Sequence, residues 1–209
     1  MSVELWLAFV VASAVVLVIP GPTILTVISY SIAHGRRASV PLVAAVALGD
    51  CTSLALSLVG LGALLAASAF WFDAVKLAGG LYLLWLGIKL LRAGVSAAEV
   101  PANTAAAHSR WRLFANTYLV TALNPKGIVF FVAFLPQFTV PGDHMTLQLW
   151  LLAATFVCMA IINATLYAVF AAKTRRLLAS HRAQRGFNTV GGSLLFAAGI
   201  WALLARRVV

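Results

Sequence analysis

The acid Asp50 and the base Lys126 each lie deep inside a long apolar run of the sequence. Asp50 follows Pro41, where its run begins, by about nine residues, which is near the middle of a membrane-spanning helix. A carboxylate at that depth is costly and therefore indicates a function. It can be protonated, pair with Lys126, or bind a substrate ammonium, and exchange between these states would couple protons to a substrate. The structural alternative is an Asp50 to Lys126 ion pair that holds the protein together.

Two proline-containing sequences, Pro20-Gly21-Pro22 and Asn124-Pro125, interrupt apolar runs. Proline lacks the N–H that a helix interior needs, and Gly21 allows the chain to turn, so each helix should stop and restart. Pro22 and Pro125 suit the first position of a restarted helix, and Asn124 is a preferred N-cap. We therefore expect two half-helix N-termini inside the protein, which would attract a carboxylate. The alternative is a simple proline kink in each helix.

Lys126 would lie in the first turn of the second restarted helix, where a cation opposes the helix dipole. An anion should compensate it, and either Asp50 or a substrate carboxylate would serve. The expected substrate is a small zwitterion, with its carboxylate at the half-helix ends and its ammonium at Asp50.

The composition places these residues in lipid. Of the 209 residues, 63% are hydrophobic and only 10% are charged, whereas soluble domains carry about 25% charged residues. This excludes an ordinary water-soluble domain. The net charge of +10 lies between the apolar runs and not on a basic face, so no nucleic-acid partner is expected. Cys51 and Cys158 lie inside apolar runs, where a thiol packs as a small hydrophobe.

The sequence predicts an all-α integral membrane protein with six transmembrane helices, because about 20 apolar residues span a bilayer and unpaired strands cannot lie in lipid. The six apolar stretches are residues 5–30, 41–68, 71–91, 113–138, 147–172 and 187–204. Most Lys and Arg residues fall in the loops after the first, third and fifth stretches. The positive-inside rule makes that side cytoplasmic and puts both termini outside, although Arg206 and Arg207 disagree.

A weak internal repeat relates residues 1–93 to residues 111–209, with 94–110 as a cytoplasmic linker. Gly79-Gly80 with Gly87 matches Gly191-Gly192 with Gly199 at identical spacing, and Asp50 matches Asn163. Three helices per copy require the second copy to enter the membrane from the other side, which is an inverted-topology repeat. Such folds place a site near the midplane, which makes Asn163 a candidate. The alternative is that the glycines only allow close helix packing.

These residues resemble the LysE/RhtB superfamily of bacterial inner-membrane amino-acid exporters. The resemblance covers essentially the whole chain. It depends on four motifs, which are Ile19-Pro20-Gly21-Pro22, Gly49-Asp50, Gly79-Gly80-Leu81-Tyr82-Leu83 with Gly87, and Asn124-Pro125-Lys126. It implies export of amino acids or derivatives, of the basic, threonine or homoserine type, driven by the proton motive force across the inner membrane. It also implies that Pro20, Pro22, Asp50, Asn124, Pro125 and Lys126 belong to the site.

The resulting hypothesis is a secondary exporter that exchanges an amino acid for protons and uses no cofactor. Heavy-metal efflux is an alternative, because Cys51 is beside Asp50, but the four histidines fall in loops. A structural or adaptor bundle is another alternative. An enzyme is not expected, because only Asp50 and Lys126 could act as an acid and base pair within the membrane. A mass of 22.1 kDa is small for a transporter, so a homodimer remains an open alternative.

Overall fold

The structure is a computed structural model that describes residues 1–67, 69–92, 109–140, 142, 144–171, 173–174 and 180–204. Within these ranges every regular element is helical, which agrees with the predicted all-α class. Most of the predicted linker, residues 94–108, lies outside the described residues, as do Arg206 and Arg207.

The first and fourth predicted spans are each divided into two helices, as the proline motifs predicted. The first becomes α1 (Val3–Val18) and α2 (Pro22–His34), and the fourth becomes α5 (Arg110–Ala122) and α6 (Pro125–Phe134). The other four spans are continuous helices, namely α3 (Ser39–Ala67), α4 (Ala69–Arg92), α7 (Met145–Val169) and α9 (His181–Leu204). Short 3-10 turns, Gly35–Ala38 and Leu135–Phe138, follow α2 and α6.

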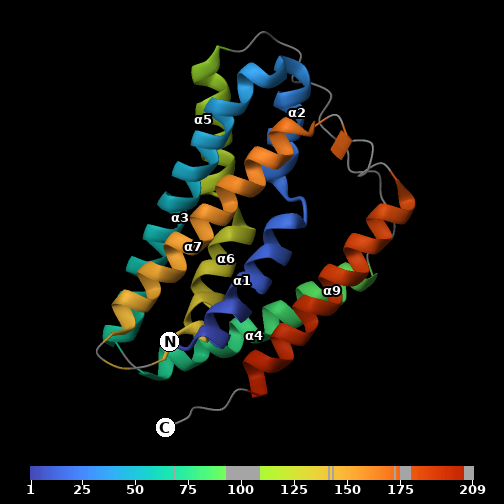
Figure 1. The fold of residues 1–209 in the computed structure, drawn as a ribbon. Helices are drawn as coiled ribbons and strands as arrows, with labels where there is room; N and C mark the ends of the chain where they lie inside the picture. Colours follow the sequence, from blue (N-terminus) through green and yellow to red (C-terminus); the bar gives the residue numbers. More distant parts are fainter. Residues whose placement is uncertain are drawn as a thin grey trace.

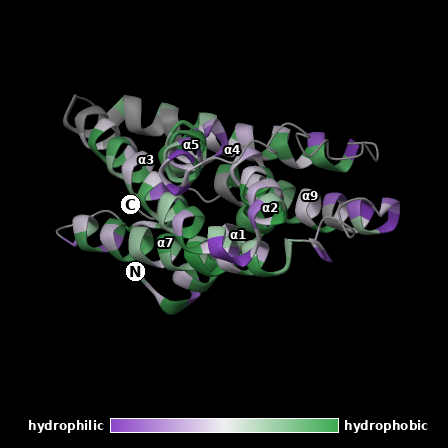
Figure 2. Ribbon diagram, turned by 90° about the horizontal axis from the view of Figure 1, so that it is seen from above, coloured by the Kyte–Doolittle hydropathy of each residue, from purple (hydrophilic) through white to green (hydrophobic). Residues whose placement is uncertain are grey.

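Several helices have the length and hydropathy to cross a bilayer. Among the described residues, two segments qualify alone, Pro22–Gly60 and Met145–Val169, and the bent pair α5 and α6 makes a third when counted as one span. The helix α1 is apolar but has only 16 residues. Large apolar side chains such as Leu56, Val59 and Trp150 are exposed, and hydrophobic residues, coloured green, occur along the helices in Figure 2. This is the surface expected of a protein that faces lipid, while six crossings remain a prediction.

A cluster of phenylalanines forms a hydrophobic core of the protein. Its members come from α1, α6, α7 and the turn after α6, and they are Phe9, Phe130, Phe131, Phe134, Phe138 and Phe156. The rings of Phe131 and Phe156 meet edge to face with centroids 4.8 Å apart. Such close aromatic contacts hold α6 against α1 and α7.

The helices α4 and α9 lie side by side and run obliquely to the other helices (Figure 1). Their crossing is made by glycines from the predicted repeat. A Cβ atom on Gly199 would lie 2.8 Å from Leu84 N and 3.0 Å from Gly80 O, and one on Gly192 would lie 3.0 Å from Gly87 O. The repeat pairs Gly80 with Gly192 and Gly87 with Gly199, so exchanging the two copies exchanges these two contacts. A twofold relation between the copies would produce this pattern, although the repeat itself remains a prediction.

We expect Gly199→Ala to destabilise the protein, because its Cβ would meet backbone atoms that cannot move independently. Overpacking of this kind costs about 1–3 kcal/mol. Gly186→Ala is the matched control on the same helix, since nothing lies within 4 Å of its Cβ position and alanine favours a helix. Thermal unfolding in detergent, followed by circular dichroism, should show a lower Tm for Gly199→Ala alone. Equal Tm values for both variants would contradict the close contact.

Candidate functional site

The two helix breaks meet at one small cavity of about 50 Å³. Its lining comes from α1, α2, α3, α6, α7 and the breaks themselves. Five of the eight predicted site residues line it, namely Gly21, Asp50, Asn124, Lys126 and Asn163. The three prolines, Pro20, Pro22 and Pro125, are adjacent in sequence to lining residues. Residues about 100 positions apart in the chain are therefore brought together at the breaks.

Direct hydrogen bonds connect the two breaks. The Asn124 side chain accepts from Lys126 N at 3.1 Å, as expected of an N-cap, and its Nδ2 donates to Thr23 Oγ1 at 3.1 Å. Pro22 and Pro125 begin α2 and α6, as predicted. The predicted reason for Gly21 is wrong, because its φ of −111° and ψ of −172° are extended values that any residue adopts. A Cβ at this position would lie in ordinary van der Waals contact with the Lys126 side chain, 3.6 Å from its Cδ.

The carbonyl groups at the end of α1, residues 16–19, all accept hydrogen bonds from side chains of other helices. The last four carbonyls of a helix have no intrahelical partner. Lys126 Nζ donates to Val16 O and to Ile19 O, the latter at 2.7 Å. Asn163 Nδ2 donates to Leu17 O at 3.0 Å, and Tyr167 Oη donates to Val18 O at 2.7 Å. Three side chains from α6 and α7 thus satisfy a helix end that water would satisfy in a soluble protein.

These contacts give Lys126 a partner other than Asp50, which was one of its two expected partners. We expected an anion, either Asp50 or a substrate carboxylate, because Lys126 opposes the dipole of α6. Its ammonium instead contacts the C-terminal carbonyls of α1, where the negative end of that helix dipole stabilises a cation. Within the described part of the chain, no ion pair joins Lys126 to Asp50. The alternative of a structural ion pair is therefore not realised in this structure.

Asp50 faces the cavity from α3, and its side chain is buried. Among the described residues, no side chain hydrogen-bonds to it and no cation lies at ion-pair distance. The neighbouring Gly49 brings α3 close to the end of α5, because a Cβ there would lie only 2.7 Å from Thr121 Cβ and 3.1 Å from Ala122 N. This close approach holds Asp50 beside the second break.

Sequence reasoning missed Tyr167 and Thr23 as members of this arrangement. Tyr167 follows Asn163 by one helical turn, so both side chains can point the same way from α7. That spacing was visible, but nothing in the sequence shows which carbonyls these side chains reach. Thr23 directly follows Pro22, which made it a candidate only once the second break was known to lie against the first.

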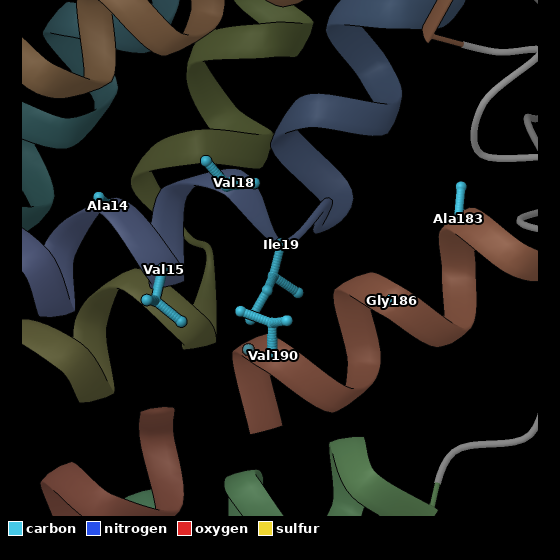
Figure 3. A pocket seen from close by; sticks show the side chains of 8 residues that line it. Ala14, Val15, Val18, Ile19, Ala183, Gly186 and Val190 are labelled. Atoms are coloured by element: carbon cyan, nitrogen blue, oxygen red, sulfur yellow. The ribbon is translucent and has the colours of Figure 1, made fainter. Parts of the chain in front are cut away.

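A larger and apolar groove of about 570 Å³ lies between α1 and α9 (Figure 3). Its lining includes Val15, Val18, Ile19, Val190 and Gly191, with no charged side chain among its members. Ile19 lines both the groove and the small cavity. The chemistry of the groove does not suit a zwitterion, so the small polar cavity is the candidate site.

The structure gives the heavy-metal alternative no supporting observation. Among the residues that it describes, no group of three or more His, Cys, Asp or Glu residues could hold a metal ion. Cys51 and Cys158 are both free and exposed.

We expect Tyr167→Phe to lower the stability by about 1 kcal/mol, because it leaves a carbonyl at the end of α1 without its donor. Tyr118→Phe is the control. This substitution removes the 3.1 Å hydrogen bond between Tyr118 Oη and Thr52 Oγ1, but the Thr52 hydroxyl still donates to Leu48 O. Thermal unfolding of the two variants should therefore show a larger loss for Tyr167→Phe. An equal loss would mean that closing the end of α1 has no special importance.

Comparison with known proteins places this geometry in a family. The family model described as LysE type translocator matches residues 14–206. The chain is 34% identical over 208 residues to the homoserine/homoserine lactone efflux protein of Salmonella typhimurium, which covers 99% of this chain and 100% of that protein. A leucine efflux protein of Klebsiella pneumoniae is 30% identical over 133 residues, 64% of this chain and 62% of that protein.

An uncharacterized membrane protein of Vibrio cholerae is 31% identical over 207 residues, again 99% of this chain and 100% of that protein. No solved structure matches the chain. The family match spans nearly all the described helices, including both breaks and every predicted site residue. The chain therefore belongs to the LysE type translocator family and is a membrane transporter, not an enzyme.

Proposed function

We propose that this protein exports amino acids or their derivatives, of the homoserine, threonine or basic type, from the cytoplasm in exchange for protons. The observation that carries the proposal is the cavity, where a buried and unpaired Asp50 faces the N-termini of two half-helices. Relatives that match along their full length are named homoserine/homoserine lactone efflux proteins, which supports a small zwitterionic or cationic substrate.

The substrate carboxylate would bind at the half-helix N-termini. The first intrahelical bonds of α2 and α6 run from Leu25 N to Gly21 O and from Ile128 N to Asn124 O. The N–H groups of Thr23, Ile24 and Gly127 precede those bonds, and all three residues line the cavity. N–H groups at a helix start, together with the positive dipole end, form a site for an anion.

Asp50 would couple the substrate to protons. An unpaired carboxylate in a lipid-embedded cavity is costly, and either a proton or a substrate ammonium removes that cost. The two cannot neutralise Asp50 together, so an arriving ammonium favours release of the proton. After the amino acid leaves, Asp50 binds a proton again, and the transporter returns with its charge neutralised.

The cavity must open for transport. A water molecule occupies about 30 Å³, so a volume of about 50 Å³ holds water and no amino acid. We propose that the three-helix halves form an inverted repeat and rock against each other to expose the site alternately. The two glycine contacts between α4 and α9, which are exchanged when the two copies of the repeat are exchanged, support this arrangement. We also propose an inner-membrane location with both termini outside, supported by the basic loops.

We expect Asp50→Asn to abolish proton-driven export, because an amide can neither release a proton nor neutralise an ammonium. The measurement is uptake of labelled L-homoserine into inside-out vesicles with an acidic interior, at matched protein levels in the membrane. Cys51→Ser is the control, since Cys51 is the next residue on α3 and is exposed. The Cys51→Ser variant should retain homoserine uptake, and cells that carry it should keep their tolerance of heavy metals. Unchanged uptake by Asp50→Asn would refute the coupling role.

We propose that the helix breaks are needed for transport, which a purely structural role of the two prolines would not require. We expect Pro22→Ala and Pro125→Ala to lose most of the uptake while the proteins still insert, because each helix could then extend backward and occupy its N–H groups. Pro41→Ala is the control, since Pro41 lies in the first turn of α3 and does not line the cavity. Full uptake by both break variants would show that transport does not need the helix breaks.

A further inference from the structure

We propose that the C-terminal carbonyls of α1 form a binding subsite for a primary ammonium group, and that the ammonium of Lys126 occupies this subsite until the substrate replaces it. The inference deepens the proposed function, because it assigns the subsite for the cationic end of the same zwitterion. It differs from the expectation that Asp50 alone receives the substrate ammonium.

The geometry of the subsite is that of an ammonium site. Lys126 Nζ donates to the carbonyls of Val16 and Ile19, and both of these residues line the cavity. Backbone carbonyls at the end of a half-helix carry a partial negative charge and coordinate cations in transporter sites. A primary ammonium with three N–H donors satisfies several such carbonyls at once.

Satisfying carbonyl groups with a lysine requires the burial of a charged group, which costs free energy. The two carbonyls between those of Val16 and Ile19 are satisfied by neutral donors, Asn163 and Tyr167. A neutral donor avoids the cost of burying a charge, so a third one would suffice if closure of the helix end were the whole purpose. The unpaired Asp50 lines the same cavity, which thus holds a basic and an acidic side chain that do not touch. A second ammonium can enter this arrangement and replace the first.

The side chain of Lys126 already lies between the two ends that it would serve. Its Nζ contacts the end of α1 and also lies 3.9 Å from the Cβ position of Gly21, the N-cap of α2. A small rotation would bring the ammonium from the α1 carbonyls to a carboxylate bound at the start of α2. The absence of a side chain at residue 21 leaves this path free.

The exchange keeps the charges of Lys126 and of the substrate compensated. The substrate ammonium takes the carbonyls that Lys126 leaves, and the displaced Lys126 pairs with the substrate carboxylate. An amine without a carboxylate would leave Lys126 without a partner, and an acid without an ammonium would leave the carbonyls unsatisfied. The subsite therefore selects molecules that carry both groups, and it does so without a contact to the rest of the side chain.

The first test uses purified Lys126→Ala in lipid nanodiscs, which empties the subsite. We expect methylammonium and ethylammonium chloride to raise its Tm saturably, because binding to the folded state stabilises it. Tetramethylammonium, which has no N–H donor, should have no such effect. Tyr167→Phe is the matched control, since it frees a carbonyl of Val18, which does not line the cavity. Neither this variant nor the wild type should respond. No shift in Lys126→Ala, or equal shifts in all three proteins, would overturn the subsite.

The second test uses the wild-type protein and remains informative if Lys126→Ala does not fold. Reductive methylation of Lys126 is measured by mass spectrometry relative to the exposed Lys89. Saturating L-homoserine should change the methylation rate of Lys126 relative to that of Lys89 several-fold. N-acetyl-L-homoserine, which lacks the ammonium, should leave this ratio unchanged. If the vesicles transport homoserine but the labelling of Lys126 does not change, the exchange is wrong and the proposed function stands. If methylammonium stabilises Lys126→Ala but no amino acid is transported, the subsite stands and the proposed function is wrong.

Discussion

The structure depends on how a helix end is satisfied where no water is available. The four carbonyls at the end of α1 lie within an apolar protein, where a carbonyl without a donor is destabilising. Donors for them come from α6 and α7, which belong to the other half of the chain. The broken first helix can therefore exist only when the second half is folded against it. The break, the cavity and the contact between the halves are consequences of one requirement.

The second break satisfies the same requirement differently. The helix α5 ends in a tight turn, in which Leu123 N donates to Leu119 O and Asn124 N donates to Thr121 O. Backbone groups thus close much of this end, and Asn124 is free to cap α6 and to contact Thr23. The two halves resemble each other in helix order but not in their polar side chains. The predicted repeat pairs Asp50 with Asn163, yet only the amide has a hydrogen bond to the opposite half in the described structure.

Much of the fold could be predicted because its determinants are local. Apolar length predicts helices, and Pro22 and Pro125 predict restarted helices at the positions where the structure has them. Five of the eight predicted site residues line one cavity, and they could be singled out because an acid, a base and two helix breaks are rare in lipid. Its contacts were not predictable. The long side chain of Lys126 can reach in several directions, and only the packing of α1 against α6 decides that it meets carbonyls. Tyr167 was missed for the same reason, since an aromatic residue in an apolar helix has no local feature that reveals a partner.

The crossing of α4 and α9 has a mechanical consequence. Where the helices cross, the glycines of α9 carry no side chain, and backbone atoms of α4 together with the side chains of Leu84 and Leu91 lie directly against them. Surfaces in such close contact resist separation, since separation would lose dispersion contacts. The crossing therefore fixes the distance between the two helix axes, and a motion of one helix relative to the other has to turn about this contact.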